Sequence, residues 1–170
     1  MPSSLTPLLL NRIRDNGPLT VAEFVDAALY HVTLGYYARA GQRSGREGDF
    51  FTSVDLGPLF GELLASQFAE MWEALREDPA SGRPGPDPPR FDLVEAAAGN
   101  GRLARDVLDA AERHHPPFYR AVRLHLAERS PQARAAQETV LGRHASVLAT
   151  TSADVPGWKL RILPALKSPI

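Results

Sequence analysis

The segment from Phe91 to Gly101 reads Phe-Asp-Leu-Val-Glu-Ala-Ala-Ala-Gly-Asn-Gly, and it decides the fold class of this chain. Its first five residues form a short, mostly apolar run that is typical of a buried strand, and the glycines that follow indicate a tight turn. Apolar residues then recur at helical spacing from Leu103 to Ala111. A strand, a glycine turn and a helix in this order predict one unit of a parallel α/β sheet.

The same alternation continues toward the C-terminus. Apolar residues at every second position of 122–126 predict a second strand, and residues 146–150 have the composition of a third. Between them, Ser130 and Pro131 are an N-cap and a first-turn residue, which predict the start of a helix. Strands that alternate with helices in this way predict right-handed βαβ units, so we expect an α/β fold with a parallel sheet.

The preceding part of the chain, residues 1–77, predicts a helical N-terminal segment with a glycine-rich loop. Leu5 to Asn16 predicts a first helix, and Thr20 with Glu23 has the capping-box spacing of a second. A long helix then starts after Pro58. We expect its apolar residues to pack in the core, namely Phe60, Leu63, Leu64, Phe68, Met71, Trp72 and Leu75.

Three regions follow from these patterns. Residues 78–90 hold five prolines and two glycines, so they predict a linker between the N-terminal segment 1–77 and a sheet domain at 91–170.

Within the sheet domain, His114 and His115 precede two prolines, and we expect a surface turn there. The five histidines of the chain show no metal-ligand spacing, so we expect no metal site.

The composition limits the class of protein. A chain of 170 residues with 44% hydrophobic and 23% charged residues has the size and composition of one folded domain. Nineteen basic and twenty acidic residues leave a net charge of -1, so we expect no nucleic-acid partner. No apolar run reaches the roughly 20 residues of a membrane span, so we expect no membrane partner. The lack of cysteine excludes disulfides and thiolate metal sites and favours a cytoplasmic protein.

Two acidic residues end the first two predicted strands. In an open parallel sheet, ligands bind beyond the carboxyl ends of the strands, and Glu95 and Glu128 are expected at that edge. Gly99 and Gly101 allow a ligand to approach the backbone closely, while an acid after the second strand can accept hydrogen bonds from a ribose. The sequence therefore predicts a cofactor that contains adenosine.

The charge of Glu95 distinguishes between cofactors. The turn also fits the dinucleotide pattern of NAD or FAD sites, but a carboxylate beside the turn would repel a pyrophosphate. S-adenosylmethionine brings an ammonium and a sulfonium instead, so the same carboxylate would attract it. We therefore favour S-adenosylmethionine. An NAD-binding domain, or an α/β sheet with incidental glycines and no nucleotide, remains an alternative because short glycine motifs are weak alone.

Six short motifs resemble one known family when they are taken in order. They are Ala28–His31, Gly35–Tyr37, Gly48–Ser53, Phe60–Leu64, Leu93–Glu95 with the Gly99-Asn100-Gly101 turn, and His125–Glu128 with Ser130-Pro131. In this order they resemble the MidA family of S-adenosylmethionine-dependent methyltransferases, over residues 5 to 152. The resemblance implies a class I, Rossmann-like methyltransferase sheet preceded by a helical segment. It also implies methyl transfer to a protein, at an arginine in the mitochondrial members.

The resemblance implies a role for each residue of the turn. Glu95 would bind the amine of the cofactor, Glu128 its ribose, and Gly99 and Gly101 would line its methionine end. Ala97 stands where the family has the first glycine of the turn, and if that position needs a positive φ, alanine costs about 1 kcal/mol or more. The resemblance also implies a loop near the cofactor and substrate cleft, which here is Gly48–Ser53. Its candidate cofactor-binding residues are Gly48, Asp49, Phe50, Thr52 and Ser53.

We therefore expect an S-adenosylmethionine-dependent methyltransferase that acts on a protein; the alternative is a catalytically silent binding or assembly module that keeps part of the fold. Asp49 and Asp55 are candidates for orienting an acceptor guanidinium. The sheet domain is expected to be partial, because it holds three recognisable strands, or four with 159–163. Both lysines, Lys159 and Lys167, lie in the last dozen residues, and we expect this tail to replace the usual continuation of the family, by truncation or a shifted reading frame. The sequence leaves open whether the protein forms a homo-oligomer.

Overall fold

The computed structural model of the 170-residue chain describes residues 4–38, 45, 48–76 and 90–153. The N-terminal part contains the helices α1 (Leu5–Asn16), α2 (Val21–Tyr30) and α3 (Leu59–Arg76) and the short 3-10 helices η1 (Tyr36–Ala38) and η2 (Ser53–Leu56). The second part contains β1 (Phe91–Ala96), α4 (Arg102–His114), α5 (Pro116–Ala121), β2 (Val122–Ala127), α6 (Pro131–Leu141), η4 (Gly142–Val147) and β3 (Leu148–Ser152). The predicted α/β fold with a helical N-terminal segment is confirmed.

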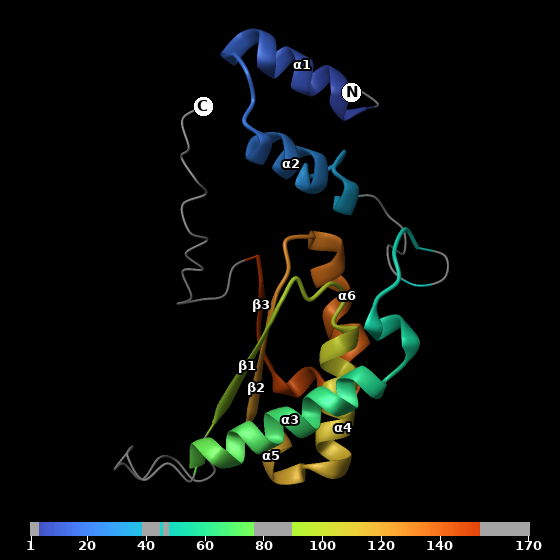
Figure 1. The fold of residues 1–170 in the computed structure, drawn as a ribbon, viewed down its shortest axis with the longest axis vertical. Coiled ribbons are helices and arrows are strands. Elements are labelled where there is room, and N and C mark those ends of the chain that lie inside the picture. The colour runs from blue at the N-terminus through green and yellow to red at the C-terminus, as the bar shows by residue number, and fades with distance from the viewer. Residues whose placement is uncertain (1–3, 39–44, 46–47, 77–89, 154–170) are drawn as a thin grey trace.

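The three strands form one parallel sheet in the order β1-β2-β3. Leu93 pairs with Leu124, and Leu124 with Leu148, so the central strand β2 is bonded along both edges. Leu124 and Leu126 of β2 are buried in one core cluster with Leu108 of α4 and Leu141 of α6. Figure 1 shows the carboxyl ends of β1 and β2 at the same end of the sheet, below α2.

Helix α3 packs closely on α4, through the side that carries small residues. Gly61, Ala65, Ala69 and Trp72 are its buried residues. A Cβ atom added to Gly61 would lie only 2.6 Å from the Cβ atom of Asp106 on α4, so the two helices approach as closely as their backbones allow. Helix α3 therefore shares its core with the sheet.

The predicted packing of the bulky stripe on α3 is wrong for several of its members. Leu63 and Leu75 are 62% and 66% exposed, and Phe60 and Met71 are exposed as well. Trp72 alone of the stripe is fully buried, while Leu64 and Phe68 are partly buried against the core. Hydrophobic spacing identified the helix correctly, but the close approach to α4 selected the small residues of the neighbouring face as the buried ones.

The expected surface turn after His115 is a helix instead. Pro116 and Pro117 occupy the first two positions of α5. The N–H groups at these positions have no acceptor within a helix, so proline costs no hydrogen bond there. This short helix carries Phe118 into the core, where its ring packs 5.4 Å from that of Phe91 and 6.0 Å from that of Trp72.

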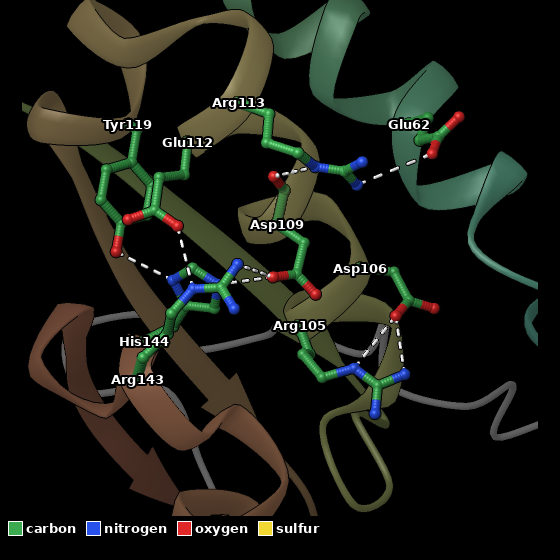
Figure 2. Close-up of polar contacts among 9 residues, drawn as sticks. All are labelled: Glu62, Arg105, Asp106, Asp109, Glu112, Arg113, Tyr119, Arg143 and His144. Atoms are coloured by element: carbon green, nitrogen blue, oxygen red, sulfur yellow. Dashed lines mark hydrogen bonds and ion pairs between the residues drawn. The ribbon is translucent and has the colours of Figure 1, made fainter.

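A polar network connects η4 to α4 and α5, and Figure 2 shows its members pointing toward one another. The imidazole of His144 is 1% exposed and lies 2.8 Å from the hydroxyl of Tyr119 and 3.1 Å from the carboxylate of Asp109. Arg143 bridges Asp109 and Glu112. Because the carboxylate only accepts, a neutral His144 donates from Nε2 to Asp109 and accepts from Tyr119 at Nδ1. Desolvation raises the pKa of the Tyr119 hydroxyl, and the nearby Glu112 charge adds to this effect.

Several expectations fall on residues whose placement is not described. The linker 78–90 lies outside the described residues except for Arg90, and so do most of the glycine-rich loop, the expected strand at 159–163 and the tail that holds both lysines. Of the helices in the described part, none combines the length and apolar character needed to cross a membrane.

Candidate functional site

The turn between β1 and α4 adopts a backbone that favours glycine. Gly99 and Gly101 have φ values of 55° and 86°, and Gly101 is the N-cap of α4. Ala97 has a φ of 57°, and within the described ranges it is the one residue other than glycine with a positive φ. The position that the family fills with glycine thus keeps the left-handed conformation here, at a cost of about 1 kcal/mol for alanine.

Glu128 follows β2 and faces this turn. Its Oε2 atom accepts a hydrogen bond of 2.8 Å from the amide of Gly99, and its Oε1 atom accepts one of 2.7 Å from the amide of Ser130. A carboxylate has about four acceptor positions, so each oxygen retains one for a ligand hydroxyl. The structure therefore places Glu128 beside the turn, with acceptor capacity to spare.

Glu95 lies at the end of β1, at the N-terminus of α4. Burial raises the pKa of its carboxyl to about 7, with a smaller contribution from the charge of Glu128, while a hydrogen bond from the backbone of Ala104 acts in the opposite direction. Two carboxylates close enough to interact and partly removed from water attract a cation. The predicted residues Glu95, Ala97, Gly99, Gly101 and Glu128 are thus brought together at one edge of the sheet.

Gln137 supports the turn from α6 and was not predicted from the sequence. Its side chain is fully buried, donates to the carbonyl of Gly99 over 2.9 Å and accepts from the hydroxyl of Thr151. It lies on the face of α6 that also buries Leu141. A glutamine among apolar positions of a helix is the signal that would have identified it, because buried amides occur where their hydrogen bonds are made.

The predicted loop residues Gly48, Asp49, Phe50, Thr52 and Ser53 lead into η2. The amide of Thr52 donates to the carboxylate of Asp55, and Arg102, the first residue of α4, donates to that carboxylate over 3.0 Å and to the carbonyl of Val54 over 3.1 Å. The segment is therefore tied to the start of α4 through η2. Contact of Gly48, Asp49, Phe50, Thr52 or Ser53 with a cofactor stays a prediction.

The proposed role of Asp55 at an acceptor guanidinium does not agree with the structure. Its side chain is only 2% exposed, and it pairs with the guanidinium of Arg102 from within the chain. Asp55 is thus occupied by an internal arginine and holds the loop in place. The sequence missed Arg102 because its partner lies 47 residues away.

The described residues contain no group of three or more histidine or acidic side chains placed to hold a metal ion. The site instead offers two carboxylates, backbone amides and a glycine turn. A family model of S-adenosyl-L-methionine-dependent methyltransferases matches residues 63–169 of this sequence. The chain belongs to this family.

Curated relatives also match this methyltransferase-family chain. It is 36% identical over 109 residues to the mitochondrial protein arginine methyltransferase NDUFAF7 of Mus musculus, and 39% identical over 105 residues to the NDUFAF7 homolog of Drosophila melanogaster. Each of these matches covers 62% of this chain and 22% of the relative. A homolog from Caenorhabditis elegans is 33% identical over 129 residues, which are 74% of this chain and 27% of the relative. The chain thus spans about a quarter of the length of the curated relatives it matches.

A solved structure shares the fold of this family member. A COG1565 superfamily member from Burkholderia thailandensis, bound to S-adenosyl-homocysteine, superposes with a TM-score of 0.62 at 26% identity. The match covers 89% of this chain and 37% of that chain. It confirms the resemblance to a class I methyltransferase sheet.

The donor set of the site fits the family's cofactor. Carboxylates bind an ammonium group and accept from the hydroxyls of a ribose, and both chemistries belong to S-adenosyl-L-methionine. A Cβ atom on Gly99 would meet nothing within 4 Å, so open space lies beside this glycine, whereas a Cβ atom on Gly101 would lie 3.5 Å from the side chain of Leu126. The residues present therefore fit the group.

Proposed function

We propose that the chain binds S-adenosyl-L-methionine at the carboxyl ends of β1 and β2 and transfers its methyl group to a protein acceptor. The observation that carries the proposal is the arrangement of two interacting carboxylates, Glu95 and Glu128, beside the glycine turn, where Gly99 donates directly to Glu128. Family membership and the relatives named as protein arginine methyltransferases support it, and we propose arginine as the acceptor.

The proposed roles follow from the geometry. Glu95 binds the amine of the cofactor in its ionised form, and Glu128 accepts from the ribose with the lone pairs that Gly99 and Ser130 leave unused. When bound, the cofactor supplies an activated methyl group on a sulfonium. Methyl transfer in line to a nucleophile requires positioning more than acid or base catalysis, so the residues of this chain act mainly by holding and orienting the cofactor.

A nicotinamide or flavin dinucleotide fits the site less well. Its pyrophosphate would approach the N-terminus of α4, where Glu95 lies. In that position the carboxylate would repel the phosphates when ionised. The same residue thus favours a cationic ligand over an anionic one.

The alternative is a binding or assembly module without catalysis. One observation favours it: Ala97 holds a left-handed conformation at the turn that approaches the cofactor, where its Cβ atom occupies space that a glycine would leave open. A catalytically silent module would keep the sheet and the core while binding the cofactor weakly or not at all.

Isothermal titration calorimetry with S-adenosylhomocysteine and with NAD tests the proposal. We expect wild-type protein to bind S-adenosylhomocysteine and not NAD. Glu128→Ala should weaken binding about tenfold or more, because hydrogen bonds to a charged group contribute roughly 1.5–3 kcal/mol each. Glu138→Gln, which changes an exposed carboxylate of α6, is the control and should bind like wild type.

Each other outcome has a defined meaning. Binding of NAD alone would contradict the methyltransferase proposal. A folded protein that binds neither ligand would favour the silent module. The acceptor class is tested with S-adenosyl-L-methionine labelled in its methyl group and two peptides that differ only in arginine or lysine, and transfer to the lysine peptide alone would contradict the arginine proposal. A cytoplasmic location also stays our proposal, to be checked by cell fractionation.

A further inference from the structure

The turn after Glu128 contacts three different parts of the chain within three residues. Glu128 accepts from Gly99 at the glycine turn. Arg129 reaches α2, where it pairs with Asp26 over 2.7 Å. The hydroxyl of Ser130 donates to the carbonyl of Tyr37, the middle residue of η1, over 3.3 Å. The residues that present Glu128 are therefore the same residues that hold α2 and η1 (Figure 1).

Arg129 makes two contacts with α2 that use different properties of its guanidinium. Its charge pairs with Asp26, and its plane lies over the ring of Tyr30, with the guanidinium carbon 3.9 Å from the ring centroid. A guanidinium above an aromatic ring is attracted to it, and arginine combines this stacking with ion pairing better than lysine does. Arg129 thus ties α2 to the turn between β2 and α6 through an ion pair and a stacking contact.

A row of aromatic rings extends from this contact toward the predicted substrate loop. Tyr30 stacks on Tyr37 with centroids 5.5 Å apart, and Tyr36 meets Tyr37 edge to face at 4.9 Å. The hydroxyl of Tyr36 donates to Asp49 over 2.5 Å. The row therefore connects the turn that holds Glu128 to the Gly48–Ser53 loop.

Glu128 depends on the conformation of this turn. The amide of Ser130 donates to its Oε1 atom over 2.7 Å, and the side-chain oxygen of Ser130 also accepts from the amide of Ala133 at the start of α6. A shift of Arg129 and Ser130 toward or away from α2 would move the donor that orients the Glu128 carboxylate. Docking of α2 and orientation of Glu128 are thus linked through adjacent residues.

We propose that Arg129 is a positioning residue, which couples docking of the α2–η1 segment (residues 21–38) to cofactor binding by orienting Glu128. The inference rests on the proposed function, since it assigns Glu128 to the cofactor ribose. Coupling between two sites is reciprocal: the factor by which docking strengthens cofactor binding equals the factor by which the cofactor strengthens docking. The segment therefore closes more firmly on the site when the cofactor is bound.

The test combines affinity with hydrogen exchange on the full chain. Arg129→Ala should weaken binding of S-adenosylhomocysteine about fivefold, a size typical of coupled sites. In wild type, S-adenosylhomocysteine should slow the exchange of the α2 amides. In Arg129→Ala it should not slow them, while the α4 amides of the variant should exchange as slowly as those of wild type. Tyr30→Leu, which removes the stacking from the other side, should behave in the same way, and Arg129→Lys should restore part of the affinity.

Arg123→Ala is the matched control, because Arg123 is an arginine of β2, the strand that precedes this turn, and its partner, Asp92, lies on β1. It should change neither the affinity nor the exchange of α2. An Arg129→Ala variant that binds S-adenosylhomocysteine as tightly as wild type would overturn the coupling and leave the proposed function intact. If wild type itself fails to bind, both the proposed function and the coupling are contradicted.

Discussion

Ala97 is an alanine in a left-handed backbone conformation, at a position where the family resemblance implies glycine. Its φ of 57° is one that glycine adopts freely and alanine only at a cost of about 1–2 kcal/mol. Replacing Ala97 by glycine removes this cost, but part of the gain in stability is offset because glycine loses more conformational entropy on folding. We expect Ala97→Gly to stabilise the protein by about 0.5–1 kcal/mol and to raise the melting temperature by roughly 1–4 °C.

Thermal unfolding followed by circular dichroism measures this effect. Ala96→Gly is the control: it changes the neighbouring residue, which lies in β1 with an ordinary extended backbone, and should destabilise by about 0.5–1 kcal/mol. Opposite signs at adjacent positions are the expected signature of the left-handed conformation. Destabilisation by Ala97→Gly would show that the strain at this position is negligible.

Glu95 makes cofactor affinity depend on pH. Because the pKa of its carboxyl is raised to about 7, it is mostly protonated at about pH 6 and mostly ionised at about pH 8. A cationic amine binds the ionised form, so at lower pH it must displace a proton. We expect the affinity for S-adenosylhomocysteine to fall about tenfold between about pH 8 and pH 6, as measured by calorimetry. In Glu95→Gln the profile should be nearly flat, with weaker binding at about pH 8; an equally steep profile would assign the titration to another group.

The same residue lowers the stability of the unliganded protein. A carboxyl whose pKa is raised on folding contributes favourably below its unfolded value of 4.5 and loses that contribution as the pH rises through 7. Glu95→Gln should therefore raise the melting temperature at about pH 8 and have little effect at about pH 4.5. A substitution that stabilises the fold but weakens ligand binding is expected where a buried charged residue serves function at a cost in stability. Unchanged melting at about pH 8 would contradict this account.

At the scale of elements, the α3–α4 contact depends on the absence of side chains. The space around Gly61 admits no Cβ atom without displacing backbone atoms of Asp106 and Val107, which would lie 2.8 and 2.9 Å away. We expect Gly61→Ala to destabilise by about 1–3 kcal/mol, since overpacking forces the helices apart. Urea denaturation measures it. Leu63→Ala on the exposed side of α3 should change stability by about 0.5 kcal/mol or less. A larger loss would support the sequence-based prediction that the bulky apolar residues of α3 pack in the core.

The helix ends show which elements a local pattern can predict. The capping box of Thr20 and Glu23 was predicted and is present, with the Thr20 hydroxyl accepting from the amide of Glu23. Ser130 likewise caps α6. These caps depend on side chains three residues apart, so the sequence contains all the information they need. The helix α5 was missed because two consecutive prolines are typical of a turn. The contacts of Phe118 with Trp72 and Phe91, which hold this helix in the core, cannot be read from the local sequence.

At the scale of the whole molecule, one core includes α3 and the sheet. Trp72 of α3 lies in the same cluster as Leu108, Leu124 and Phe118. We therefore expect α3 to unfold together with the sheet, in one cooperative transition. In a Trp158→Phe background, the fluorescence of Trp72 and the circular dichroism signal should give the same midpoint. An earlier fluorescence transition would instead show that the region before the linker folds as an independent unit.

The sequence by itself determined the alternation of strands and helices, the glycine turn and the acids that end β1 and β2, because each rests on periodicity or on neighbours along the chain. The resemblance to a methyltransferase family rests on six short motifs that are likewise read along the chain. Only the tertiary structure decided which face of α3 is buried, that Asp55 pairs with Arg102, and that Arg129 holds α2 beside Glu128. The physical reason is the same in each case: these contacts join residues far apart in the chain, and their geometry exists only after the helices pack on the sheet.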